Sequence, residues 1–276
     1  MLLTFFRTLV ASAAVFVASP VALSQSLDQI IDRYEAFDRA GDPEKSAKAN
    51  SEAARSWQVV SPSYIRDRAR SASQMLAALD ALGYTTEGPE VPILRHLLNA
   101  HIDAHAYDTA RIPFTGDWGF FAAPAFAAMR TRLTTRSQTE AWIDRLNDLP
   151  RYFDQQTENM SRGIATGWTQ HGDPLNTSIA QIRAQIVEDP ADSTLFLPFE
   201  SLSASDLSEN DILLLQARGR TAVGEAIDAY RDLLTFMEME YAPAARVAPR
   251  LSSPALSFAE RITRSASIRR PKISAK

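Results

Sequence analysis

The chain has no cysteine and only four histidines among its 276 residues. The absence of cysteine excludes a disulfide framework, a thiolate metal site and a lipid anchor attached to cysteine. The net charge of −4 gives no electrostatic basis for binding nucleic acid. Segments that alternate between polar and apolar residues, as β-strands do, are scarce. What remains is an ordinary globular composition, 45% hydrophobic and 22% charged, in a chain long enough for an ample core.

The first residues have the pattern of an export signal. One positive charge, Arg7, precedes an apolar run from Thr8 to Val17, and small residues are placed for cleavage before Gln25. The run is shorter than the roughly 20 apolar residues that span a bilayer. We therefore predict a cleaved signal peptide over residues 1–24, no stable membrane span after its removal, and a periplasmic or secreted protein. An uncleaved membrane anchor is the alternative.

Helical periodicity dominates the middle of the chain. Residues 25–61 are polar, with a weak helical pattern at their start and a solvated middle. From Pro62 onward, apolar residues recur at intervals of three and four, which predicts an all-α domain over residues 62–250. The longest stripe is predicted to end before Pro243, and it consists of Val223, Ile227, Tyr230, Leu234, Met237 and Tyr241.

Three local patterns add detail to this outline. "SQTE" at Ser137–Glu140 has the form of a capping box at the start of a helix. "STLFLPFE" (193–200) could be a short extended piece, although Pro198 argues against a central strand. The tail, residues 251–276, is basic and lacks an apolar period, so we predict disorder without a folded role; a functional basic tail is the alternative.

Motifs of catalytic chemistry are few. There is no G-x-S-x-G elbow, no phosphate-binding loop and no dinucleotide fingerprint. "HIDAH" places His101 and His105 one helical turn apart, which is the spacing that zinc peptidases use in His-Glu-x-x-His. Ile102 stands where that motif has its general base, and no third ligand is marked. Both histidines also lie on the apolar stripe of the predicted helix. They are therefore weak metal candidates, and packed or hydrogen-bonded helix histidines are the favoured interpretation.

Two polar stretches are candidates for a binding surface. "TGDWGFF" (115–121) places Asp117 and Trp118 in a predicted loop that either lines a pocket or forms a turn with a core tryptophan. "DQQTENMSRGIATG" (154–167) continues a helix whose start is apolar, and its polar residues either face a substrate or network, or form a solvated helix face. Its glycines, Gly163 and Gly167, indicate a close helix contact or a helix end.

Four stretches of the chain occur in an order that is typical of one family. They are "RIPFTGDWGFF" (111–121), "LNDLPRYFDQQTENMSRGIATGW" (146–168), "IVEDPADSTLFLPFE" (186–200) and "AIDAYRDLLTFMEMEYAPAAR" (226–246). Together they resemble the N-terminal half of the bacterial family named domain of unknown function 885. Its members are exported or lipid-anchored, helical, about twice as long as this chain, and similar to zinc metallopeptidases. The resemblance covers roughly residues 60–250 and implies a multi-helix array like the N-terminal lobe of a zincin-like helical metallopeptidase.

The resemblance also carries an expectation about what this chain lacks. The family's His-Glu-x-x-His zinc helix lies in the C-terminal half, and this chain stops before it. From about Val247 the sequence departs from the family pattern, and the tail has the composition of an out-of-frame reading of GC-rich DNA. The implied chain is a truncated half that forms a cleft wall without catalytic residues or cofactor, whereas a full-length relative would hold zinc and a peptide substrate. The wall candidates are Asp117, Trp118, Gln156, Glu158, Asn159 and Arg162.

Three functions are compatible with these observations. The first is a fragment of an exported zinc hydrolase of peptidase type, inactive alone. The second is a non-enzymatic helical module of the periplasm that binds a peptide or a partner protein. The third, an enzyme that uses His101 and His105, is the least supported.

Overall fold

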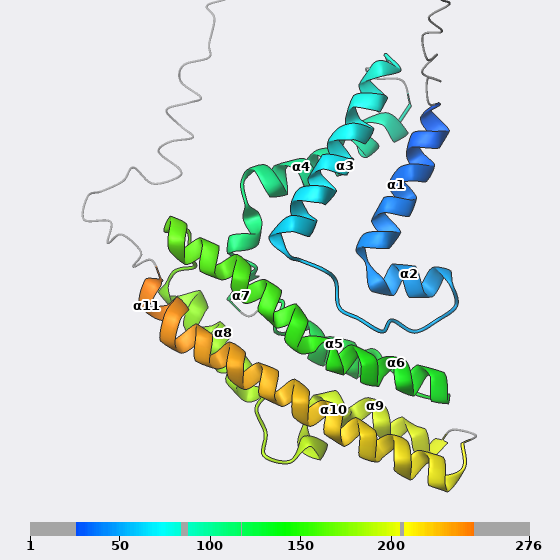
Figure 1. Cartoon of the computed structure of the whole chain (residues 1–276), viewed down its shortest axis with the longest axis vertical. Coiled ribbons are helices and arrows are strands. Elements are labelled where there is room, and N and C mark those ends of the chain that lie inside the picture. The colour runs from blue at the N-terminus through cyan, green and yellow to red at the C-terminus, as the bar shows by residue number, and fades with distance from the viewer. Residues whose placement is uncertain (1–25, 84–87, 117, 205–206, 246–276) are drawn as a thin grey trace, which may run out of the picture.

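The computed structural model describes residues 26–83, 88–116, 118–204 and 207–245. These residues are mostly helical, which confirms the all-α prediction (Figure 1). The predicted signal peptide, residues 1–24, and the predicted tail, residues 251–276, lie outside the described residues. Within the described part of the chain, no helix is both long and apolar enough to cross a membrane.

The N-terminal helices form a small bundle of their own, drawn in blue and cyan in Figure 1. Its elements are α1 (Leu27–Gly41), α2 (Pro43–Ala49), α3 (Pro62–Ala81) and α4 (Glu90–Ala106). Ser61 caps α3 by accepting the amide hydrogen of Tyr64, and such a cap contributes about 1 kcal/mol. The apolar stripes of α1, α3 and α4 meet in a small core that consists of Ile30, Ala72, Met75, Leu79, Val91, Leu94 and Leu98.

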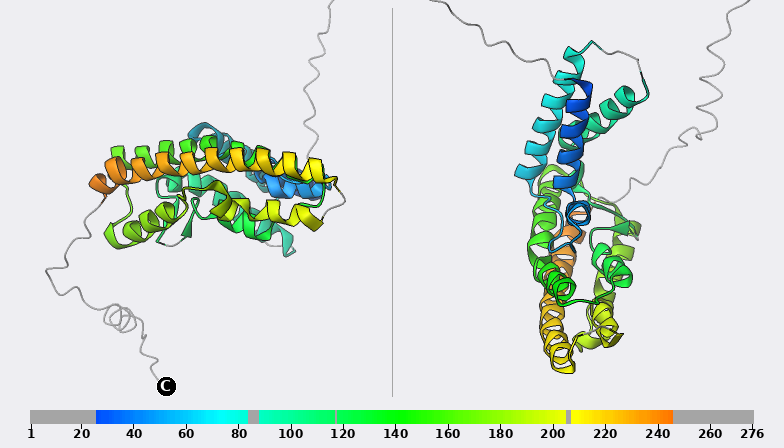
Figure 2. Two further views of the ribbon diagram at one scale, coloured as in Figure 1. Left: turned by 90° about the horizontal axis from the view of Figure 1, so that it is seen from below. Right: turned by 90° about the vertical axis from the view of Figure 1, so that its right-hand side faces the viewer.

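The rest of the chain packs as two layers (Figure 2). One layer consists of α6 (Arg136–Asn147) and α7 (Leu149–Thr166), which follow each other directly, beside the long helix α10 (Glu209–Phe236). Residues later in α6 and α7 contact residues later in α10, so α10 runs parallel to both helices. Glu140 pairs with Arg218, and the rings of Phe153 and Tyr230 meet edge to face at 4.9 Å.

Shorter elements form the second layer. They are α5 (Ala123–Arg130), α8 (Gly172–Ala184), α9 (Leu197–Glu200), the 3₁₀ turns Thr109–Arg111, Pro190–Asp192, Thr194–Phe196 and Ser201–Ala204, and the strands β1 (Phe114–Thr115) and β2 (Trp118–Gly119). The two strands pair antiparallel, with Phe114 opposite Gly119. The main core lies between the layers, and its largest fully buried side chains include Phe121, Tyr152, Phe199, Tyr230 and Tyr241.

Two local predictions, for a helix cap and for an extended piece, differ from the structure. The cap of α6 is Thr135 instead of Ser137, because the hydroxyl of Thr135 accepts the amide hydrogen of Gln138. The stretch "STLFLPFE" is a 3₁₀ turn followed by α9 and is not extended, since Ser193 caps the turn and Pro198 fits the first turn of a helix.

The end of the longest helix also differs from its prediction. The helical path does not stop before Pro243; it passes through a π turn, Met237–Tyr241, into α11 (Ala242–Ala244). Proline has no amide hydrogen to donate to the carbonyl one turn earlier. The helix widens into the π turn just before Pro243.

The segment 25–61 is more ordered than its polarity indicated. It holds α1 and α2, and Ile30 and Trp57 within it are 0% and 5% exposed. Asp42 caps α2 by accepting the amide hydrogens of Glu44 and Lys45. This segment therefore contributes to both apolar cores, while its middle, which includes α2, has no buried residue and is solvated as predicted.

Candidate functional site

The polar face of α7 binds an extended stretch of the same chain. Residues 57–60 cross this helix without secondary structure of their own. The amide of Trp57 donates to a carboxylate oxygen of Asp148 at 2.7 Å, and its carbonyl accepts from the guanidinium of Arg151 at 2.9 Å. Arg151 also donates to Asp148 at 2.6 Å, and this hydrogen bond is the main reason that the pKa of Arg151 is raised. The indole of Trp57 stacks on the ring of Tyr152, at 5.8 Å between centroids.

The other end of this stretch is bound in the same way. The amide of Val60 donates to the side-chain oxygen of Gln155 at 2.8 Å, and its carbonyl accepts from the side-chain nitrogen of Asn159 at 2.7 Å. The backbone groups of an extended segment need partners when they leave water. The side chains of α7 supply these partners at both ends, so the helix acts as a clamp on residues 57–60.

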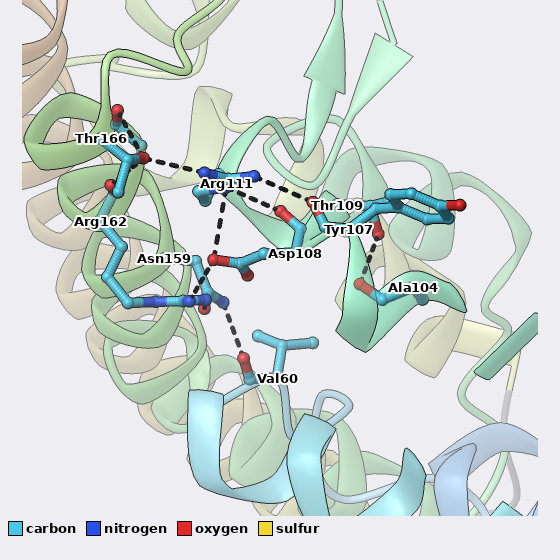
Figure 3. A network of polar contacts seen from close by, with 10 residues as sticks. Val60, Ala104, Tyr107, Asp108, Thr109, Arg111, Asn159, Arg162 and Thr166 are labelled. Carbon is cyan, nitrogen blue, oxygen red and sulfur yellow. Dashed lines mark hydrogen bonds and ion pairs between the residues drawn. The ribbon is translucent and has the colours of Figure 1, made fainter. Parts of the chain in front are cut away.

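The clamp continues into a charged network at the end of α4, shown in Figure 3. Arg162 donates to the side-chain oxygen of Asn159 at 2.6 Å and to the carboxylate of Asp108 at 2.5 Å. Arg111 binds the carbonyl of Asp108 and the hydroxyl of Thr166. This network joins α4, the turn that follows it, and α7, and it holds the N-terminal bundle against the helical layers.

The glycines of α7 have the two roles that the sequence indicated. A Cβ atom at Gly163 would lie 2.6 Å from the carbonyl oxygen of Trp168 and 3.0 Å from that of Arg111, so the chain approaches the helix closely here. Gly167 has φ = 70° and ends α7, with the amide of Trp168 donating to the carbonyl of Gly163 at 2.8 Å.

A cleft of about 590 Å³ opens between the clamped segment, α7 and the β1–β2 hairpin. We call it the central cleft. Its walls are largely aromatic and aliphatic, including Phe114, Trp118, Phe120 and Tyr152, and its polar side chains are mostly amides. The indole of Trp118 is 62% exposed at the rim and stacks on Phe126 at 5.1 Å. A volume of this size with a few convergent polar groups is typical of a ligand site.

Tyr152 lies where the clamp and the central cleft meet. Its side chain is 2% exposed, and burial raises the pKa of its hydroxyl above the usual value, although the side chains of Gln156 and Gln58 partly offset this effect through hydrogen bonds. The hydroxyl therefore stays protonated and neutral at physiological pH. It serves as a hydrogen-bonding group beside two amides and carries no charge.

The structure brings together some of the predicted wall residues and separates others. Trp118, Gln156 and Asn159 all line the central cleft. The side-chain amide of Asn159 already forms two hydrogen bonds: its nitrogen donates to the carbonyl of Val60, and its oxygen accepts from Arg162. Arg162 is directed to Asp108 and does not line the cleft.

Two wall candidates remain, Glu158 and Asp117. Glu158 is exposed and does not line the central cleft, although it lies between two residues of α7 that do. Asp117 lies outside the described residues. The sequence reasoning missed the contributions of Gln58 and Tyr152, and the one available signal was an aromatic residue, Trp57, in an otherwise polar segment.

His101 and His105 do not form a metal site with other described residues. His101 packs edge-on against Phe37 at 5.0 Å, and burial, together with the positive charge of Arg68, lowers its pKa. His105 is exposed, contrary to its expected place on the apolar stripe. Among the described residues, no group of three His, Cys, Asp or Glu side chains is placed to hold a metal ion. These residues therefore do not fit a zinc ion, and zinc stays an expectation for longer relatives.

The fold and cleft define an all-α protein in which a polar helix clamps an extended segment beside an aromatic, amide-bearing cleft. The chain belongs to the family described as bacterial protein of unknown function (DUF885), whose family model matches residues 38–268. This match confirms the family that the sequence predicted, and it extends further at both ends than residues 60–250. A search of curated proteins found no match to the chain.

Proposed function

We propose that the protein binds an extended peptide in the central cleft and forms the substrate-holding wall of an exported hydrolase of peptidase type. The observation that carries this proposal is the composition of the cleft. Aromatic walls provide apolar contact for side chains, and the amides of Gln58 and Gln156 can both donate to and accept from a peptide backbone. The exposed indole of Trp118 at the rim is the kind of aromatic anchor that dominates binding energies.

The clamp shows that this part of the protein already binds an extended backbone. Residues 57–60 lie across α7 with their amide and carbonyl groups paired to side chains. The central cleft begins at this segment, since Gln58 and Val60 belong to its wall. A bound peptide would lie beside residues 57–60, which are themselves an extended segment. The peptidase chemistry rests on the family resemblance alone, and the export of the protein rests on that resemblance and on the signal-peptide pattern of residues 1–24.

The proposal is tested by measuring binding of fluorescein-labelled peptide pools to the full chain by fluorescence anisotropy. We expect binding without cleavage. Trp118→Ala should weaken binding about tenfold or more, because it removes a large aromatic contact. Trp168→Ala is the matched control, since this indole is 54% exposed and lies outside the central cleft. Equal effects of both substitutions would refute the cleft as the binding site.

A non-enzymatic binding module is the second candidate, and one observation favours it. Three wall residues of the central cleft, Phe114, Phe120 and Tyr152, belong to the main apolar core, so the cleft is a built part of this fold. A monomer that melts cooperatively and binds peptides would support the module. Chelator-sensitive cleavage of the peptides by the purified chain would contradict both candidates.

A further inference from the structure

A second pocket continues the central cleft past Trp118. Its volume is about 320 Å³, and the two spaces share Gln58, Trp118, Ala123 and Tyr152 as wall residues. We call it the arginine pocket, because Arg130 and Arg145 line it together with the aromatic rings of Trp57, Trp118 and Phe126. A peptide in the central cleft would reach this pocket with one of its ends or side chains.

Arg145 is the unusual residue of the arginine pocket. It is 8% exposed, and its guanidinium lies 3.9 Å from the ring centroid of Trp57. One terminal nitrogen donates to the carboxylate of Glu44 at 2.7 Å. Its Nε atom is buried and has no hydrogen-bond partner among the described residues. A buried donor without an acceptor is costly, and this one belongs to a side chain that lines the arginine pocket.

Arg130 adds a second cation to the arginine pocket, at the last turn of α5. Its side chain is exposed, and it forms no ion pair with any residue that the structure describes. The two carboxylates of the pocket wall are already engaged. Asp42 accepts the backbone amides of Glu44 and Lys45, and Glu44 accepts from Arg145. The pocket wall therefore holds two arginines and two carboxylates, and of the two arginines only Arg130 has no carboxylate partner among the described residues.

We propose that the arginine pocket receives a carboxylate of the bound peptide, with an apolar side chain against the exposed rings of Trp118 and Phe126. Arginine binds carboxylates with short, charge-assisted hydrogen bonds, which suits Arg130 and Arg145. This inference rests on the proposed peptide binding and specifies the chemical group that is recognised. The carboxylate belongs either to the C-terminus of the peptide or to an acidic side chain near it.

Three labelled peptides distinguish these sources. The first has four alanines and a C-terminal phenylalanine with a free carboxylate, the second is its C-terminal amide, and the third is an amide that ends in aspartate. We expect the free acid to bind the full chain at least tenfold more tightly than the first amide. Binding of the aspartate amide as tight as that of the acid would assign the carboxylate to a side chain, and weak binding would assign it to the C-terminus.

Two substitutions connect this preference to the pocket. Arg130→Gln should abolish most of the difference between acid and amide, because it removes the exposed cation. Arg132→Gln is the matched control, since it removes an equal charge two positions away on an exposed residue outside the pocket. Equal binding of all three peptides to the unaltered protein would overturn the inference while the proposed function stands. Absence of binding by all three peptides would overturn both.

Discussion

Asn159 is the residue on which the clamp depends most, and Asn159→Ala tests it. The side chain is 0% exposed and makes two hydrogen bonds, to the carbonyl of Val60 at 2.7 Å and from Arg162 at 2.6 Å. Alanine would leave both partners without their bond. Each such orphaned group costs about 1–3 kcal/mol when water cannot replace the lost partner. Arg162 is partly exposed, so we expect a total loss of about 2–4 kcal/mol in the free energy of unfolding.

A loss of this size is easily measured. Thermal and urea unfolding of the full chain, followed by circular dichroism, should show a decrease in Tm of roughly 5–15 °C. Glu158→Ala is the control, because this neighbouring side chain is exposed and should change stability by less than about 0.5 kcal/mol. A loss below about 1 kcal/mol for Asn159→Ala would refute the argument that the clamp holds residues 57–60 in place.

Two further substitutions test the packing and the charge balance of the fold. Gly163→Ala should destabilise the protein by about 1–3 kcal/mol in urea unfolding, because its Cβ would lie 2.6 Å from the backbone oxygen of Trp168; Gly172→Ala, where nothing lies within 4 Å, should be nearly neutral. His101 has a lowered pKa, from burial and from Arg68, so its neutral form is favoured in the folded state. Its contribution to stability is therefore complete above the ordinary pKa of 6.5 and is lost as the pH falls below it. His101→Gln should reduce the decrease in stability between about pH 7 and pH 5, and an unchanged pH profile would contradict this reasoning.

The helical class was predictable because periodicity reports directly on burial. Of the stripe predicted for the longest helix, every residue except Leu234 is fully buried. The glycines of α7 were also interpretable from sequence, because a helix end and a close approach both require the absence of a Cβ atom. Periodicity did not reveal the β1–β2 hairpin, since strands of two residues are too short to show alternation.

The site was less predictable, for a physical reason that Asn159 illustrates. Its amide binds the backbone of Val60, which lies 99 residues earlier in the chain. A backbone carbonyl has no sequence signature, so no pattern of residue types could have revealed this partner. The polar residues of α7 were singled out, but their sequence could not distinguish a contact with the protein's own backbone from a contact with a ligand.

The positions along α7 resolve the question that its polarity raises. Asp148 at the N-cap, Gln155 and Asn159 bind the extended segment 57–60, and the central cleft is lined by Tyr152, Gln156 and Asn159. Because a helix places residues three and four positions apart on neighbouring lines, the same turns can serve both surfaces at once. The segment that the first set binds forms one wall of the cleft that the second set lines. The polarity of this helix is therefore required twice, for holding the wall in position and for presenting amides to whatever lies against it.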